Sequence, residues 1–166
     1  MKTNILVTGG CGFIGSSFID IILNKKKYNL INIDKLTYAS NKSYSIIKKK
    51  NYKFVKGCIT NFSLIKKVMK KYKPAYIFNF AAETHVDNSI KGPKIFLDTN
   101  INGTYNILKN ITDLKLSKFT KFIQISTDEV FGDRYKKSKS NENSKYEPSS
   151  PYSASKAAAD HLVTSW

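Results

Sequence analysis

The stretch VTGGCGFIG, residues 7–15, decides the fold, because it places Gly9, Gly12 and Gly15 three residues apart directly after an apolar run. Glycine permits a tight turn with positive φ. A helix that begins directly after such a turn presents its first N–H groups to a phosphate. The spacing differs from the commoner G-x-G-x-x-G, so it indicates a dinucleotide site only if a strand precedes it and a helix follows it.

Outward from this turn, β-rich apolar segments alternate with segments of helical period. Strands are expected at residues 3–8, 29–34, 52–57, 75–80 and 121–126, and helices at 13–24, 61–72 (with Asn61 as its cap), 93–114 and from 151 onward. This alternation predicts an α/β fold, a Rossmann-type doubly wound parallel sheet with helices on both faces. Since such sheets contain about six strands, the sheet is expected to be incomplete at the C-terminus.

Two of the expected helices rest on particular apolar residues. The helical spacing in 13–24 comes from Phe13, Ile14, Phe18, Ile21 and Ile22. In 93–114, the residues expected to face the core are Ile95, Phe96, Thr99, Ile107, Leu108 and Ile111.

An acidic residue ends the second expected strand, at Asp34, about 20 residues after the glycine turn as the dinucleotide fingerprint requires. Its carboxylate can accept hydrogen bonds from the ribose hydroxyls of an adenosine, and it would repel a 2′-phosphate. The turn and the acid together predict NAD rather than NADP as the cofactor.

A tyrosine and a lysine lie four residues apart at the start of the last expected helix, Tyr152 and Lys156. They share one face of that helix. A phenol has a pKa near 10 and is a poor base at neutral pH, but a nearby ammonium favours the phenolate. The spacing alone is common by chance; after a dinucleotide turn it predicts a general base that deprotonates a sugar hydroxyl.

The net charge of +16 raises the question of nucleic-acid binding. Every basic residue except Arg134 is a lysine, whereas readers of bases and phosphates favour arginine. The lysines are therefore interpreted as solvated surface that attracts anionic substrates, and nucleic acid is not expected as a partner.

The two cysteines, Cys11 and Cys58, have neither metal-site spacing nor a disulfide framework, so no metal is expected. The apolar N-terminal stretch is interrupted by Thr8, glycines and Asp20, unlike a signal peptide, and the sequence shows no run long enough to span a membrane. A soluble, cytoplasmic protein is expected.

Five segments together resemble a known family: VTGGCGFIG (7–15), DKLTYASN (34–41), AAETHVD (81–87), STDEVFG (126–132) and PSSPYSASKAAADHLV (148–163). The family is the extended short-chain dehydrogenase/reductases, and within them the nucleotide-sugar 4,6-dehydratases. The resemblance runs along the whole chain but covers only the N-terminal half of the family's protein. It implies that residues 1–166 are the NAD-binding Rossmann domain and that the C-terminal substrate domain is absent.

The resemblance also implies a reaction. It is a lyase reaction on a nucleotide sugar: oxidation at C4, loss of water across C5 and C6, and reduction at C6, in deoxysugar biosynthesis such as that of dTDP-rhamnose. Glu129 would be the base at C5, Asp128 the acid for the leaving hydroxyl, and Thr127 would contact the C4 hydroxyl beside Tyr152. For Asp128 to act as an acid near pH 7, Glu129 and the exclusion of water must raise its pKa. Simple epimerases and decarboxylases of the superfamily lack this acid pair.

Further positions match the family's cofactor and sugar contacts. The expected cofactor contacts besides the glycines, Asp34, Tyr152 and Lys156 are the backbone of Phe13 and Ile14, then Lys35, Thr37, Ala39, Cys58, Ile59, Ala81, Ala82, Thr99 and Ser126. Thr84 and His85 are expected on the sugar side, although a lone histidine is often structural. Cys58 stands where the family usually has aspartate near the adenine, and Asn88 where bacterial relatives often have arginine.

The partners follow from the same resemblance. It implies dTDP-glucose as substrate, with a UDP-glucose dehydratase or a related nucleotide-sugar epimerase as the alternative. It also implies a homodimer, packed through helices 93–114 and 151–166. Two other hypotheses stay open: a truncated chain that binds NAD without turnover, and a nucleic-acid binder driven by charge.

Overall fold

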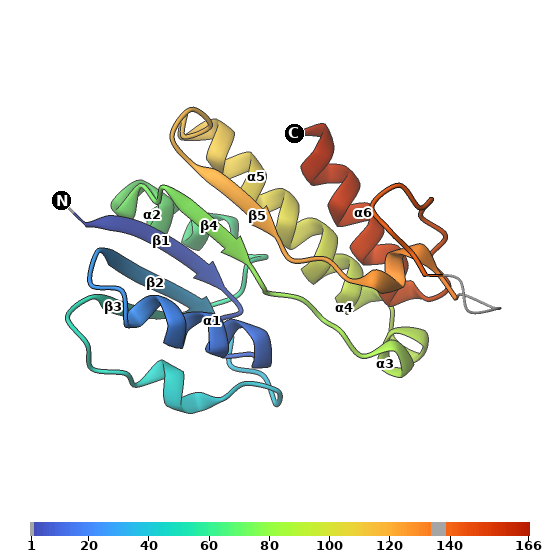
Figure 1. Cartoon of the computed structure of the whole chain (residues 1–166), viewed down its shortest axis with the longest axis horizontal. Coiled ribbons are helices and arrows are strands. Elements are labelled where there is room, and N and C mark those ends of the chain that lie inside the picture. Colours follow the sequence, from blue (N-terminus) through green and yellow to red (C-terminus); the bar gives the residue numbers. More distant parts are fainter. Residues whose placement is uncertain (1, 134–138) are drawn as a thin grey trace. The chain divides into compact units, whose positions relative to one another are not determined.

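The computed structural model describes residues 2–133 and 139–166, so Arg134 lies outside the described residues (Figure 1). The chain forms two compact units. Unit 1 comprises Met1–Ala81 and Asn106–Ile125, and unit 2 comprises Ala82–Tyr105 and Ser126–Trp166. Each unit is described by itself.

Unit 1 contains a five-stranded parallel sheet in the order β3-β2-β1-β4-β5. Its strands are β1 (Thr3–Thr8), β2 (Tyr28–Asp34), β3 (Tyr52–Lys56), β4 (Tyr76–Asn79) and β5 (Lys121–Gln124). The register places Thr8, at the carboxyl end of β1, opposite Ile33 and Asn79. All five strands lie where the sequence predicts them, and the Rossmann-type order is confirmed.

Helices lie on both faces of this sheet, as expected of parallel strands. They are α1 (Phe13–Leu23), α2 (Phe62–Tyr72) and α5 (Gly103–Asp113), with a 3₁₀ turn η1 (Lys42–Ser45) between β2 and β3; the first three residues of α5 belong to unit 2. The cap expected at Asn61 is present, since its side chain accepts a hydrogen bond from the N–H of Leu64 at 3.0 Å.

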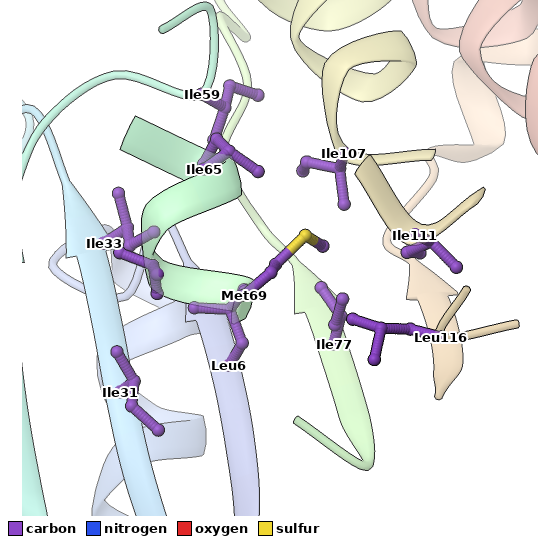
Figure 2. Close-up of a cluster of buried hydrophobic side chains, with 11 residues drawn as sticks. Leu6, Ile31, Ile33, Ile59, Ile65, Met69, Ile77, Ile107, Ile111 and Leu116 are labelled. Atoms are coloured by element: carbon purple, nitrogen blue, oxygen red, sulfur yellow. The ribbon is translucent and has the colours of Figure 1, made fainter. Parts of the chain in front are cut away.

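One buried cluster joins α2 and α5 to the sheet (Figure 2). Met69 of α2 lies between Leu6 and Ile77 of the strands and Ile107 of α5. All four residues are fully buried. Burying such side chains is the main stabilising contribution of this face, worth roughly 1.5–3 kcal/mol each.

A second cluster joins α1 to the sheet through Ile19 and Leu23, with Phe18 and Ile22 packed against it. The expected apolar face of this helix is therefore partly wrong. Phe13, Ile14 and Ile21 are exposed by 90%, 59% and 58%. The reason is that Gly15, in the first turn of α1, packs against the glycine turn, and this rotates the buried face onto Gly15, Ile19 and Leu23.

Unit 2 is mainly helical. Its elements are α3 (Val86–Lys91), α4 (Lys94–Phe96), a π-helical segment η2 (Leu97–Asn102), a 3₁₀ turn η3 (Asp128–Phe131) and α6 (Pro151–Ser165). Helix α6 begins with a capping box between Ser150 and Ser153, with Pro151 in its first turn.

The expected long helix 93–114 is thus α4, η2 and α5 in succession. Phe96, Thr99, Ile107, Leu108 and Ile111 are buried as expected, but Ile95 is 48% exposed. Ile95 and Phe96 are adjacent and lie about 100° apart around the helix, and it is Phe96 that is turned inward, against the ring of Tyr152.

Among the described residues, none of the helices has both the length and the apolar character needed to cross a membrane.

Candidate functional site

The glycine turn of unit 1 is shaped by two close contacts. Gly9 has a φ of +69°, and a Cβ added there would lie 2.5 Å from the N atom of Ala81. A Cβ at Gly15 would lie 2.5 Å from the carbonyl oxygen of Gly9. These two positions therefore require glycine for packing alone.

Gly12 differs from the other two glycines. A Cβ there would meet only the carbonyl oxygen of Gly9, at 3.3 Å, so internal packing does not demand glycine so strictly. Gly12 is the N-cap of α1 and has no side chain with which to cap it. The first N–H groups of α1, including those of Phe13 and Ile14, have no partner within the helix, and this end of the helix dipole is positive. The turn can therefore hold an anionic group such as a pyrophosphate.

The carboxylate of Asp34 lies beside the same turn and is nearly buried. It accepts hydrogen bonds from the N–H of Cys11 at 2.9 Å, from the N–H of Leu36 at 2.8 Å and from the hydroxyl of Ser40 at 3.1 Å. A carboxylate has about four acceptor positions, so one further donor such as a ribose hydroxyl can still be accommodated. Asp34 also anchors the segment that follows it.

That following segment contains the expected adenosine-side residues. Lys35 and Thr37 are half-buried and Ala39 is exposed. The segment is joined to the glycine turn where the N–H of Asn41 donates to the carbonyl oxygen of Cys11 at 2.7 Å. The expected adenosine contacts and the glycine turn are therefore structurally linked.

The expected adenine-side pair follows β3. Cys58 is half-buried, and its sulfur accepts a hydrogen bond from Thr60 at 3.1 Å, while Ile59 is buried. The side chain of Asn106 donates to the carbonyl oxygens of Ile59 at 3.2 Å and Thr60 at 2.8 Å. This asparagine holds the segment after β3 against α5, a role that apolar periodicity does not reveal.

In unit 2, the structure brings Tyr152, Thr127 and the two acids together. The phenol of Tyr152 is buried, its ring packs edge-on against Phe96 at 6.4 Å, and it shares a side-chain hydrogen bond with Thr127. Asp128 and Glu129 are close enough to act on the phenol electrostatically. These four residues were expected to act on one sugar ring.

The pKa of Tyr152 differs from the expectation. Burial raises it above the ordinary value, the carboxylates of Glu129 and Asp128 raise it further, and only the hydrogen bond from Thr127 lowers it. The sequence interpretation had Lys156 lowering this pKa, but burial and the two neighbouring negative charges outweigh any such effect here.

Lys156 lies one turn further along α6 and is 4% exposed. Burial lowers the pKa of its ammonium, while the carboxylate of Asp160 raises it. An ammonium in such surroundings can lose its proton more readily than a surface lysine.

The acid pair lies in η3. Thr127 is its N-cap, and its hydroxyl oxygen accepts a hydrogen bond from the N–H of Glu129 at 3.3 Å. The pKa of Glu129 is raised, first by partial burial and then by the charges of Asp128 and Asp133. Because its pKa is raised, Glu129 is a stronger base than an ordinary glutamate.

The other expected residues of unit 2 are more dispersed. The hydroxyl of Ser126, expected near the cofactor, donates to the carboxylate of Asp160, which also accepts from the hydroxyl of Tyr146 at 3.2 Å. Thr84 and His85 are exposed, with His85 as the N-cap of α3. Ala82 is half-buried, and Thr99 is buried within η2.

One buried residue of unit 2 was missed by the sequence reasoning. Asn100, in η2, accepts from the N–H of Glu83 at 2.8 Å and donates to the carbonyl oxygen of Glu83 at 3.0 Å and to the hydroxyl of Ser155 at 2.9 Å. It ties the segment that precedes α3 to the helix that bears Tyr152 and Lys156. The signal that could have found it is an asparagine inside an otherwise apolar helix face.

The chain is similar in sequence and in fold to known proteins. A dTDP-glucose 4,6-dehydratase from Haemophilus influenzae is 46% identical over 173 residues, covering 98% of this chain and 51% of the relative. The crystal structure of dTDP-glucose 4,6-dehydratase from Bacillus anthracis in complex with NAD is 42% identical with a TM-score of 0.85, and covers 98% of this chain and 50% of that one. The enzyme of the same name from Streptomyces venezuelae, with NAD bound, is 35% identical with a TM-score of 0.89, covering 98% and 51%.

These relatives confirm the resemblance found in the sequence motifs, and the chain spans about half the length of the curated relatives it matches. The model of the family described as GDP-mannose 4,6 dehydratase matches residues 6–166. The chain therefore belongs to the GDP-mannose 4,6 dehydratase family, among the nucleotide-sugar 4,6-dehydratases.

Proposed function

We propose that the chain carries the NAD site and the catalytic residues of a dTDP-glucose 4,6-dehydratase, and that the family's remaining length supplies the substrate domain. The observation that carries the proposal is the grouping of Tyr152 and Thr127 with the carboxylates of Asp128 and Glu129 in unit 2. Oxidation at C4 needs only a phenolic base, whereas removal of water needs an additional base and an additional acid. The relatives at 40–46% identity that are named for this reaction support the same proposal.

The cofactor proposal rests on the residues of unit 1. The uncapped start of α1 at Gly12 suits a pyrophosphate, and the remaining acceptor position of Asp34 suits a ribose hydroxyl. NAD, when bound, would supply the acceptor and later the donor of a hydride. NAD is also the ligand named for the Bacillus anthracis and Streptomyces venezuelae enzymes.

Tyr152 would take the proton of the C4 hydroxyl as hydride leaves the same carbon. Its raised pKa means that the resting phenol is protonated, so it must lose its proton before the reaction. Lys156, whose own pKa is lowered by burial, and the hydrogen bond from Thr127 would stabilise the phenolate. Thr127 would also hold the C4 hydroxyl.

The two acids would then remove water. Glu129, with its raised pKa, would accept the proton from C5, which the C4 ketone makes acidic. Asp128 would donate a proton to the C6 hydroxyl, which leaves as water. The hydride then returns to C6 and a proton to C5, giving the 4-keto-6-deoxy sugar.

A paired substitution tests this assignment. In the complete enzyme, Asp128→Asn with Glu129→Gln should still oxidise C4, seen as accumulating absorbance of reduced cofactor, while release of the 4-keto-6-deoxy sugar falls by about a hundredfold or more. The matched control is Glu142→Gln, which removes an exposed carboxylate of the same unit outside the pair. If the double variant forms product at the native rate, the assignment of the acids is wrong.

A second proposal concerns the assembly of the protein and follows from unit 2. Ile95, Leu97, Tyr105 and Trp166 expose between 40% and 49% of their surface along α4, η2, α5 and α6, which suits a homodimer formed through these helices. Leu97→Asp should shift the sedimentation of the protein from dimer to monomer. A dimer that persists in this variant would contradict the proposed interface.

The remaining alternatives for the function differ in the substrate that is turned over, and the following test distinguishes them. Mass spectrometry of the purified protein for bound NAD, followed by incubation with dTDP-glucose and with UDP-glucose, distinguishes a thymidine enzyme, a uridine enzyme and a chain that binds NAD without turnover.

A further inference from the structure

A fully buried asparagine lies in the middle of strand β2 in unit 1. The side chain of Asn32 is 0% exposed. Its Oδ1 accepts a hydrogen bond from the N–H of Gly10 at 3.1 Å, and its Nδ2 donates to the hydroxyl of Tyr52 at 2.8 Å and to the sulfur of Cys11 at 3.5 Å. A buried amide is unfavourable unless its polar groups are paired, whereas an apolar side chain could fill the same space without polar partners. Its presence therefore calls for a role beyond packing.

The second member of the network is Tyr52 on β3, which is 7% exposed. Its hydroxyl donates to the backbone carbonyl oxygen of Tyr44, in η1, at 2.5 Å. Burial raises the pKa of Tyr52 to about 12, so the hydroxyl remains a donor at any physiological pH. The hydroxyl of Tyr44 in turn donates to Asp20 of α1 at 2.5 Å.

The network connects the glycine turn to the segment that follows Asp34. At one end, a Cβ at Gly10 would lie 2.3 Å from Oδ1 of Asn32, so the turn and the amide are in direct contact. At the other end, Tyr44 closes the segment 35–45, whose other attachments to the turn are the bonds of Ser40 to Asp34 and of Asn41 to Cys11. The segment 35–45 includes Lys35, Thr37 and Ala39, which are expected to contact adenosine.

We propose that Asn32 and Tyr52 are positioning residues for the dinucleotide, which hold the glycine turn and the segment 35–45 at the separation that an adenosine pyrophosphate requires. The inference rests on the proposed NAD site. Neither residue touches the cofactor; each acts through the backbone that does. Loss of the Tyr52 hydroxyl leaves the Nδ2 of Asn32 with only its long contact to the sulfur of Cys11 and removes the donor to the carbonyl oxygen of Tyr44. The segment is then free to move away from the turn.

The test is calorimetric titration of the protein with NAD and, separately, with ADP. Tyr52→Phe keeps the ring and its packing, and should weaken the binding of both ligands roughly tenfold, which is what the loss of one buried hydrogen-bond partner produces. ADP is included because the loss is expected on the adenosine side. The matched control is Tyr76→Phe on β4, whose ring packs on the same cluster and for whose hydroxyl no hydrogen bond is found within the described residues; its affinities should equal those of the unmodified protein.

A second variant separates positioning from stability. Asn32→Leu should weaken ADP binding as Tyr52→Phe does, and the double variant should be no weaker than the worse single one, since the two residues act as one unit. A lower melting temperature with unchanged affinities would show a purely structural role and overturn the inference. Failure of the unmodified chain to bind NAD or ADP would instead overturn the cofactor proposal on which the inference rests.

Discussion

The two compact units differ sharply in charge. Unit 1 holds 20 lysines and three acidic residues, a net charge of +17, whereas unit 2 holds eight basic and nine acidic residues, a net charge of −1. The +16 of the whole chain is therefore a property of unit 1 alone. The glycine turn lies in the strongly basic unit, and the phenol with its two carboxylates lies in the neutral one.

This difference separates two kinds of chemistry. A positive field attracts an anionic dinucleotide from a distance and needs no particular lysine. Proton transfer depends instead on a few groups at hydrogen-bonding distance, whose pKa values are set by burial and by neighbouring charges. Changes at the proton-transferring groups of unit 2 should therefore affect mainly the rate of the reaction, and changes in the glycine turn of unit 1 should affect mainly the binding of the cofactor.

The largest effect is expected from Tyr152→Phe in unit 2. Removal of the phenolic hydroxyl should lower oxidation at C4 by about 10²- to 10⁴-fold, the usual contribution of a general base, while bound NAD measured by mass spectrometry stays unchanged. Ser165→Ala, which removes a hydroxyl from the exposed surface of the same unit, is the control. A variant that loses NAD together with its activity would contradict the separation of roles.

Smaller effects are expected from two glycines of unit 1, and they should differ in kind. Gly15→Ala places a Cβ 2.5 Å from a backbone oxygen, so it should lower the free energy of unfolding by about 1–3 kcal/mol, measured by urea denaturation. Gly12→Ala meets only a contact at 3.3 Å, so it should weaken NAD binding with little loss of stability. Equal stability losses in both variants would show that Gly12, too, is required for packing.

A change of several-fold is expected from salt. Raising the ionic strength from about 0.01 M to about 0.1 M shortens the screening length from about 30 Å to about 10 Å, so the association rate of NAD measured by stopped flow should fall several-fold. Uncharged adenosine is the control and should show no dependence. A salt-independent rate for NAD would mean that the charge of unit 1 has no part in cofactor capture.

The smallest effect concerns the pH dependence of water loss. In its proposed role as the base at C5, Glu129 must be deprotonated. Because its pKa is raised, we expect activity to be lost, as the pH falls, at a higher pH than for an ordinary glutamate. Asp133→Asn removes one of the charges that raise this pKa, so the acid limb of the kcat/KM profile should move to lower pH. An unchanged limb would indicate that a different group titrates.

The order of strands and helices followed from local chemistry. The alternation of apolar segments, the glycine turn and the cap at Asn61 each depend on residues within one or two turns of the chain, and all three appear in the structure as predicted. The candidate residues Thr127, Asp128, Glu129 and Tyr152 were also found together, because the motifs that contain them occur in one family.

Other features depended on residues distant in sequence, and only the tertiary structure decided them. The side of α1 that is buried was set by the contact of Gly15 with the glycine turn, and the packing of Phe96 against Tyr152 left the adjacent Ile95 exposed. The upward shift in the pKa of Tyr152 was decided by burial and by carboxylates more than 20 positions away in the sequence. The sequence by itself thus determined which elements form and which motifs they bear, since these are local preferences. The fold decided burial, the partners of Asn32 and the charge around the phenol, because such properties exist only once distant segments are packed together.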